Sequence, residues 1–379
     1  MISQSLSWTP ATGWSKPCSS LPPVADLVLC FGSADHLAGS RGPGAELRRL
    51  YPKALAAACS TAGEICDGTV SDNGLTALVI RFDRARVRGV CAVVKSPGDS
   101  EQAGNEVGRG LLDPELRHVL VLSDGLAING TALTAGLRAA LPPGVHATGG
   151  LAGDGARFGR TMVGLGGEIG PGRVVGIGFY GDSLQARFGS AGGWLAFGPT
   201  RRVTKAEANV LFTLDDKPAL ELYKRYLGER AADLPGSGLL FPLQLLSAAS
   251  EETGLVRTIL AVDEERQSLT FAGDIPVGHY VRLMKAGTDA MVEGARSAAG
   301  VPGRGTARGG RAAILVSCVG RKLILGRRVE EEVDAVLAEL GEGVSAAGFY
   351  SYGEICPSGL AHGCELHNQT MTVTLIGES

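Results

Sequence analysis

The chain has 379 residues, a formal net charge of −3, and 44% hydrophobic against 20% charged residues. This balance is typical of a globular protein, and it argues against nucleic acid or an anionic membrane as the main partner. No signal peptide is evident in the first twenty residues, and no apolar run approaches the ~20 residues of a membrane-spanning helix. We therefore expect a soluble, cytoplasmic protein whose eight cysteines are reduced thiols.

Residues 1–23 are polar and contain prolines, so we expect a flexible N-terminal arm. A first strand–helix–strand unit follows. Its expected elements are an apolar strand over 24–31, a helix over 45–58, the turn CSTAGEIC over 59–66 and a strand over 75–81.

The same order of elements occurs twice more. The middle copy has a strand over 118–122, a helix over 131–140, TGGLAGDG over 148–155 and a strand over 160–165. The last copy has a strand over 312–318, a helix over 329–340, the turn YSYGEIC over 350–356 and a half-buried strand over 370–376. These copies predict a mixed α/β fold with two pseudo-related halves, built from strand–helix–strand repeat units and mixed β-sheets.

Each copy places a glycine and then an acid where the helix has returned to a strand. The three pairs are Gly63-Glu64, Gly153-Asp154 and Gly353-Glu354. Glycine tolerates sharp turns, so each turn is expected to aim one carboxylate and exposed backbone amides in a fixed direction. We predict that a ligand lies among these three turns.

A domain boundary is predicted just before residue 218. Residues 218–227 begin with proline and are followed by Gly228, which are helix start and stop signals. We therefore predict an N-terminal domain over 24–216 and a C-terminal domain over 217–379. The second domain should contain a β-meander over 239–285, a helix over 287–299 and a flexible basic loop over 298–310.

The last loop of the chain is dense in metal-ligand side chains. Cys356, His362, Cys364 and His367 lie within twelve residues of one another. They could hold zinc, although the spacing is not a standard finger spacing, or offer a thiolate or imidazole to a haem iron. The alternative is a loop in which these residues are incidental.

Other polar groups follow predicted strands, where ligands usually dock in α/β units. Asp124 and Arg321 occupy equivalent positions in two copies, and Asn368 and Gln369 lead into the last strand. They could bind a ligand, or they could cap helices and hold loops. A hydrolytic alternative would use Cys59 or Ser60 as a nucleophile, but no histidine is obviously paired with either.

The chain resembles the FIST family of sensory domains in both its N-terminal and its C-terminal part. The matching stretches are CSTAGEI (59–65), LVLSDGLAINGTAL (120–133), GGLAGDG (149–155), the segment over 197–228, DIPVGHYVRLMKA (274–286), SCVGRKLILG (317–326), GFYSYGEICP (348–357) and ELHNQTMTVTLI (365–376). They cover nearly the whole chain from about residue 24, and their joint occurrence is specific.

The resemblance implies a stand-alone sensory domain that binds a small molecule such as an amino acid. The partner would be a separate histidine kinase, a diguanylate cyclase or phosphodiesterase, or a chemotaxis receptor. The motif matches place ligand-binding residues at Ser60, Gly63, Glu64, Asp124, Gly150, Asp154, Arg321, Tyr352, Glu354, His367, Asn368 and Gln369.

We assign expected roles to these residues. The three acids of the Gly-acid turns would hold an ammonium or hydroxyl group, Arg321 a carboxylate, and Asn368 and Gln369 would set orientation. No catalytic residue, metal or cofactor is expected in this reading. The alternatives are a haem-based nitric oxide sensor, which some relatives of this kind are described to be, and an amide hydrolase.

Overall fold

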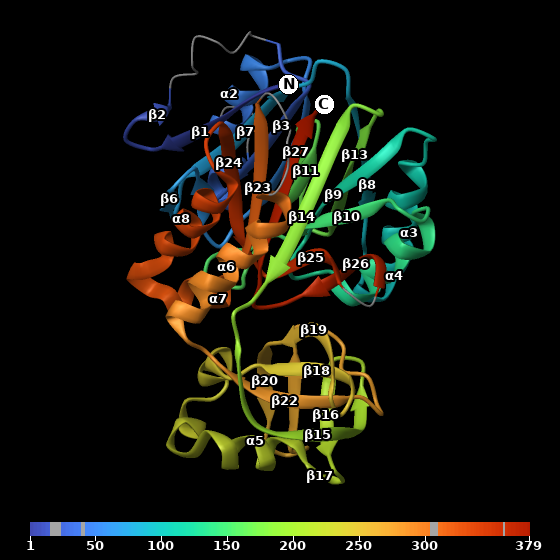
Figure 1. Ribbon diagram of the computed structural model, residues 1–379, viewed down its shortest axis with the longest axis vertical. Coiled ribbons are helices and arrows are strands. Elements are labelled where there is room, and N and C mark those ends of the chain that lie inside the picture. The colour runs from blue at the N-terminus through green and yellow to red at the C-terminus, as the bar shows by residue number, and fades with distance from the viewer. Residues whose placement is uncertain (16–23, 39–41, 304–309, 359–360) are drawn as a thin grey trace.

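The chain forms a large body and a smaller β-rich lobe, with both termini on the body at the end away from the lobe (Figure 1). The computed structural model describes residues 1–15, 24–38, 42–303, 310–358 and 361–379. No helix in this described part combines the length and apolar character needed to cross a membrane. The mixed α/β fold predicted from the repeats is confirmed.

Three sheets build the body. The first has the order β12-β11-β4-β3-β7-β1-β2, with bounds Glu168–Gly170, Val163–Leu165, Leu55–Ser60, Leu27–Gly32, Leu75–Arg81, Ile2–Thr9 and Gly13–Trp14. The second is β26-β25-β10-β9-β13-β8, with bounds Ala361–His367, Gly353–Ser358, His146–Leu151, Leu116–Ser123, Arg173–Tyr180 and Arg86–Val93. The third is β14-β27-β23-β24-β5-β6, with bounds Leu184–Ala191, Met371–Glu378, Arg311–Cys318, Val344–Ser351, Glu64–Cys66 and Thr69–Ser71.

The three predicted repeat units are the centres of these sheets. Each contributes a parallel strand pair, β3 with β4, β9 with β10, and β23 with β24. One hydrophobic core takes residues from all three sheets, among them Phe31, Leu120 and Phe349. Helices cover the opposite faces. They are α1 (Ala34–Leu37), α2 (Pro43–Leu50), α3 (Ser100–Gly110), α4 (Gly130–Ala140), α6 (Thr288–Gly303), α7 (Val319–Leu325) and α8 (Val329–Leu340). The short 3-10 helices η1 (Pro97–Asp99) and η4 (Gly326–Arg328) precede α3 and α8.

Each repeat unit passes its next strand to a neighbouring sheet. After β4 the chain enters the third sheet, where β5 pairs with β24. After β24 it enters the second sheet, where β25 pairs with β10. After β10 it enters the first sheet, where β11 pairs with β4. The Gly-acid turns are the points at which these three cyclic exchanges occur.

The lobe has its own sheet and its own hydrophobic core. Its order is β19-β18-β22-β15-β16-β21-β20, with bounds Glu251–Arg257, Leu243–Ala248, Tyr280–Lys285, Leu195–Glu207, Val210–Leu214, Ser268–Phe271 and Ile259–Asp263. The remaining elements are β17 (Lys217–Pro218) beside β16, α5 (Ala219–Leu227), η2 (Gly228–Asp233) and η3 (Gly236–Leu240). Strands from both sides of the predicted boundary at residue 217 share this sheet, so the division in space does not follow that boundary.

Two predictions near the N-terminus are wrong. Within the expected flexible arm of 1–23, residues 2–9 form β1, which pairs with β7, while residues 16–23 lie outside the described part. The predicted helix over 45–58 ends at Leu50, and β4 already begins at Leu55. The polar residues of β1 are accepted because that strand lies near the edge of its sheet, and Pro52 marks the end of the helix.

Two predictions near the C-terminus also need comment. The last strand, β27, is buried along its whole length and not half-buried. Its polar positions are tolerated because Thr372 and Thr374 hydrogen-bond to the hydroxyls of Ser190 and Thr148. For the predicted basic loop over 298–310, α6 continues to Gly303 and residues 304–309 lie outside the described part.

Candidate functional site

The three Gly-acid turns meet at one junction inside the body. The Ala62 amide donates to the Tyr350 carbonyl at 2.8 Å, and the Gly153 amide donates to the Ser60 carbonyl at 2.9 Å. The Tyr352 amide closes the ring by donating to the Leu151 carbonyl at 3.1 Å. The turns therefore lie together, as predicted, but their backbones pack directly against one another.

The two glutamates of these turns are bonded within the protein. Glu64 is 2% exposed and accepts from the Thr61 hydroxyl at 2.7 Å and the Gly74 amide at 3.1 Å. Glu354 is 0% exposed and accepts from Ser351 at 2.6 Å and from the Thr370 amide and hydroxyl at 3.1 and 2.9 Å. Each carboxylate thus fastens the loop that follows a strand exchange.

Burial dominates the titration of both glutamates. It raises the pKa of Glu64 and of Glu354 to about 7, and the hydrogen bonds that each accepts oppose part of that shift. Neither carboxylate is among the described residues that line the larger cavity between body and lobe. Both acids are bonded within the protein, and their expected role in holding a ligand ammonium stays a prediction.

The two aspartates have the same kind of role. Asp154 accepts from the amides of Gly159 and Arg160 at 3.3 and 3.0 Å and pairs with the Arg157 guanidinium. Burial opposes its ionisation, but the guanidinium and the amides together hold the pKa of Asp154 below its ordinary value. Asp124 accepts from three backbone amides at 2.8–2.9 Å and so shapes the loop before α4.

Arg321 is not available to bind a ligand carboxylate. Its guanidinium is 0% exposed and donates to the Glu332 carboxylate at 3.0 and 2.7 Å. It also donates to the carbonyl of Gly192, which precedes the lobe, and to that of Met291, which follows it. Arg321 therefore clasps the two segments that connect the lobe to the body.

The candidate nucleophiles are bonded or inert. The Ser60 hydroxyl donates to the Gly153 carbonyl at 2.8 Å and accepts from the Met162 amide at 2.9 Å, so it has no base as a partner. Burial, and then the neighbouring Cys30, raise the pKa of the Cys59 thiol well above its ordinary range. Neither residue has the activated state that covalent catalysis requires.

The candidate metal ligands are buried in or beside the second sheet. Cys356 and Cys364 are 1% and 0% exposed, and burial raises the pKa of both thiols. The His367 Nε2 donates to the Cys356 carbonyl at 3.0 Å, and burial with the Arg257 charge lowers the pKa of His367 to about 4. The side chain of His362 lies outside the described residues.

Cys356, Cys364 and His367 are not arranged as a haem or zinc site, and the side chain of His362, the fourth candidate, lies outside the described residues. Within the described part of the chain, no group of three histidine, cysteine or acidic side chains is placed to hold a metal ion. None of Cys356, Cys364 and His367 lines the cavity between the body and the lobe. A haem iron would therefore find no open ligand position among the three.

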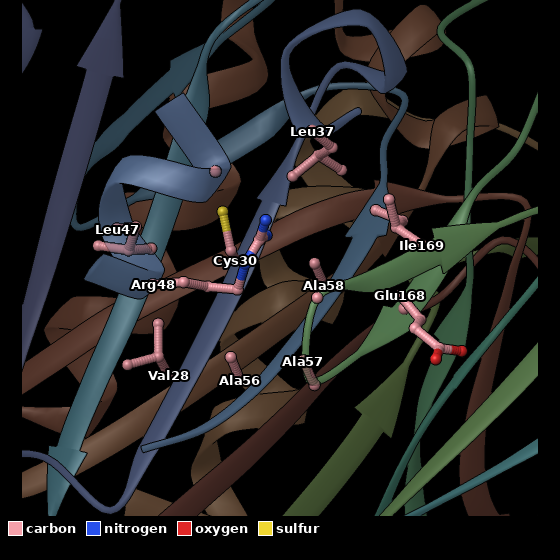
Figure 2. A pocket seen from close by; sticks show the side chains of 13 residues that line it. Val28, Cys30, Leu37, Leu47, Arg48, Ala56, Ala57, Ala58, Glu168 and Ile169 are labelled. Carbon is pink, nitrogen blue, oxygen red and sulfur yellow. The ribbon is translucent and has the colours of Figure 1, made fainter. Parts of the chain in front are cut away.

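A small cavity lies between the first sheet and α2. Figure 2 shows the Cys30 thiol and the Arg48 side chain at this cavity, with the Glu168 carboxylate pointing away from it. Burial raises the pKa of Cys30 to about 12, despite the nearby Arg48 charge. The volume is about 20 Å³, which suits one water molecule and excludes a metabolite.

A much larger cavity, of about 390 Å³, lies between the body and the lobe. We call it the interlobe cavity. The body lines it with the loop before α4, the start of α7, and Leu151, Phe158, Tyr352 and Asn368. The lobe supplies Asn209, Leu239, Thr258 and Leu260 at the start of β20, and the stretch 271–274 that ends β21 and follows it.

Three polar atoms at this cavity have no hydrogen-bond partner. They are Thr258 Oγ1, Asp274 Oδ1 and Asn368 Oδ1, each removed from solvent within the protein. An unpartnered buried polar atom costs about 1–3 kcal/mol, so native proteins rarely keep several of them in one place. Each of the three atoms has almost no accessible surface, so none of them faces the open space of the cavity, and a ligand would reach them only after their side chains turn.

Of the twelve predicted site residues, Tyr352 and Asn368 line the interlobe cavity. Gln369 lies just behind it, with its amide against Gly320, and both its Oε1 and Nε2 lack partners. Gly63 and Gly150 are structural, because Gly63 has φ +139° and a Cβ on Gly150 would lie 2.6 Å from Val316. The other predicted residues hold the junction, the loops or the connecting segments.

Sequence reasoning missed the lobe half of the site. Thr258, Leu260, Phe271 and Asp274 were not singled out, although Asp274 opens the stretch DIPVGHYVRLMKA. The available sign was Asp274 itself, a charged residue directly before Ile-Pro in a segment that is otherwise rich in predicted strands.

The comparisons with known proteins agree with the predicted family. The FIST N domain model matches residues 26–217 and the FIST C domain model matches residues 219–357. Among curated proteins none matches the chain.

One solved structure aligned with the chain is a cyanuric acid hydrolase from A. caulinodans. The two are 12% identical with a TM-score of 0.19, over 78% of this chain and 99% of that chain. A likeness at this level says nothing about activity. FIST domains are sensory domains, which is consistent with a sensor role. By its match to both domain models over most of its length, the chain belongs to the FIST family.

Proposed function

We propose that this chain is a sensory protein that binds a small polar molecule, such as an amino acid or a related metabolite, in the interlobe cavity. The cavity itself carries this proposal, because body and lobe together line it and Thr258, Asp274 and Asn368 are among its few polar residues. The volume of about 390 Å³ lies in the range of small-molecule sites. The cavity also has a mostly apolar lining with few polar groups, which is the usual composition of such sites.

Binding between two bodies offers a way to produce a signal. The chain leaves the body near Gly192 and returns before α6, so two connecting segments carry the lobe (Figure 1). A ligand that contacts both sides favours one position of the lobe over others, because it binds that position more tightly. We propose that a separate histidine kinase, cyclic-dinucleotide enzyme or chemotaxis receptor reads this position.

A thermal-shift screen of amino acids and related metabolites, followed by calorimetry on each hit, tests the proposal. Thr258→Val and Asn368→Leu should each weaken binding about fivefold or more, since each removes one hydrogen-bonding group. Thr270→Val is the matched control, because Thr270 is half-buried in the same lobe and does not line the cavity. Unchanged affinity in both cavity variants would contradict the assignment of the site.

A further inference from the structure

We infer that the ligand of the interlobe cavity is an amine, with an ammonium group that pairs with Asp274 and an apolar, planar framework that contacts Phe158. This inference rests on the proposed function, because it names the chemical class that the same cavity would accept. It also replaces the expected pairing of the ligand with the acids of the Gly-acid turns, which are already bonded within the protein.

Charge is the first argument. Asp274 is the only charged side chain among the described residues that line the cavity, and no lysine, arginine or histidine accompanies it there. A ligand carboxylate or phosphate would meet the Asp274 carboxylate, whose nearest cation is the buried Arg257 guanidinium behind the cavity wall. A ligand ammonium would instead gain a charge-assisted hydrogen bond.

The backbone of Asp274 is fixed across the interface, whereas Oδ1 of its carboxylate is buried without a hydrogen-bond partner. The Asp274 amide donates to the hydroxyl of Thr131, at the start of α4, at 3.3 Å. Its carbonyl accepts from Arg257 Nε at 3.2 Å, and Arg257 Nη1 donates to the carbonyls of Val256 and Leu366. Arg257 Nε and Nη1 therefore donate to backbone carbonyls, and Oδ1 of Asp274 has no hydrogen-bond partner.

The other two unpartnered atoms agree with a donor-rich ligand. The Asn368 Nδ2 group already donates to the His367 carbonyl at 3.0 Å, which leaves Oδ1 as an acceptor. The Thr258 hydroxyl also accepts hydrogen bonds. An ammonium group has three donors and no acceptor, so it suits the Asp274 carboxylate, whereas Thr258 Oγ1 and Asn368 Oδ1 are buried and would bond to it only after their side chains turn.

The mouth of the cavity is apolar and aromatic. The ring of Phe158 stacks on that of Tyr352, with centroids 4.5 Å apart and an interplanar angle of 16°. Phe158, Leu126 and Leu260 are 50%, 43% and 49% exposed, which is unusual for side chains of this size in one place. They offer an apolar framework a surface from both the body and the lobe.

Phe158 is held in this position by its backbone. It has φ +50°, a strained value for a bulky residue, and its amide donates to the Tyr352 hydroxyl at 3.3 Å. That hydroxyl in turn donates to the Gly155 carbonyl at 3.0 Å. Aromatic faces also attract ammonium groups, so the pair suits both parts of the proposed ligand.

Three related probes separate the charge from the framework. They are 2-phenylethylamine, L-phenylalanine and 3-phenylpropanoate, which share one ring and differ in the ammonium and carboxylate groups. Calorimetry on the full chain should give at least tenfold tighter binding for the amine than for the carboxylate. L-phenylalanine should fall between them or match the amine.

Variants then test the two contacts. Asp274→Asn keeps the shape and should weaken binding of the amine about tenfold to a hundredfold, without weakening 3-phenylpropanoate. Asp233→Asn is the control, because Asp233 is an exposed acid of the same lobe that does not line the cavity. Phe158→Ala should weaken the amine several-fold, and melting temperatures of all variants verify folding.

Two results would overturn the inference. One is binding of 3-phenylpropanoate as tightly as the amine, and the other is no binding of the amine at millimolar concentration. The proposed function survives either result if another metabolite binds and Asn368→Leu abolishes that binding while Asp274→Asn does not. Both ideas fail if the hits of the metabolite screen are indifferent to every cavity variant.

Discussion

The buried pair of Arg321 and Glu332 should control how firmly the lobe is attached to the body. Both side chains are 0% exposed, and the Glu332 carboxylate also accepts from the Ser317 and Tyr350 hydroxyls at 3.0 and 2.8 Å. Glu332→Gln keeps the size of the side chain and removes its charge. The guanidinium of Arg321 is then buried without a counter-ion.

The expected cost follows from those contacts. Breaking a buried ion pair by removing one charge destabilises a protein by about 3–5 kcal/mol. Arg321 keeps its two carbonyl acceptors, on Gly192 and Met291, so we expect a value near the lower end, about 3 kcal/mol. The double variant Arg321→Met, Glu332→Gln should be less destabilised than the sum of the single variants by about 2 kcal/mol, since no charge is left unpaired.

Denaturant unfolding followed by tryptophan fluorescence measures these values. Trp194 lies in the first connecting segment and donates from Nε1 to the Gln369 carbonyl at 2.9 Å, so its emission reports on the clasp. Glu331→Gln is the control, because Glu331 is on the same helix and pairs with Arg328 at the surface. A loss below about 1 kcal/mol for Glu332→Gln, or strict additivity in the double variant, would refute the clasp.

Three further predictions concern single positions. Burial raises the pKa of Glu354 to about 7, so its protonated form stabilises the fold below about pH 4.5 and this stability is lost as the pH rises to about 7. Relative to the wild type, the free energy of unfolding of Glu354→Gln should therefore rise by on the order of 3 kcal/mol between about pH 4.5 and pH 7. Denaturant unfolding at several pH values measures this difference, and a difference that does not change with pH would contradict the prediction. A Cβ at position 193 would lie 1.8 Å from the Ala290 carbonyl oxygen, so Gly193→Ala should lower the melting temperature strongly. Gly198→Ala is the control and should lower it far less, because Gly198 also has a positive φ but no close neighbour. Equal losses in the two variants would mean that backbone strain, and not the clash, is the whole cause. Thr258→Val should stabilise the ligand-free protein by about 1 kcal/mol, because it removes a buried hydroxyl without a partner, and a clear loss in denaturant midpoint would show that the hydroxyl is bonded.

Local patterns were enough to find most of the individual elements. The strand over 75–81 and the helix over 329–340 occur at the predicted bounds. Apolar spacing and flanking glycines and prolines are local properties, so they predict such elements well. The threefold recurrence and the meeting of the Gly-acid turns could be predicted for the same reason, because each copy repeats one local pattern.

The roles of the polar residues could not be found in this way. Glu64, Glu354 and Arg321 look like ligand-binding groups in the sequence, yet each is fully bonded to residues that packing brings beside it. A carboxylate at a turn has the same local sequence whether it faces a ligand or fastens a loop. Only the partners supplied by other strands decide between these two outcomes.

The candidate site itself depends on contacts between distant parts of the chain. Asp274 and Thr258 belong to the lobe, Asn368 and Phe158 belong to the body, and about a hundred residues separate each lobe residue from each body residue. The sequence by itself determined the repeat units, the sharp turns and the family. The strand exchanges, the clasp on the lobe and the unpartnered atoms of the interlobe cavity were decided by tertiary structure, because each arises from side chains and backbone groups that meet only after the chain has folded.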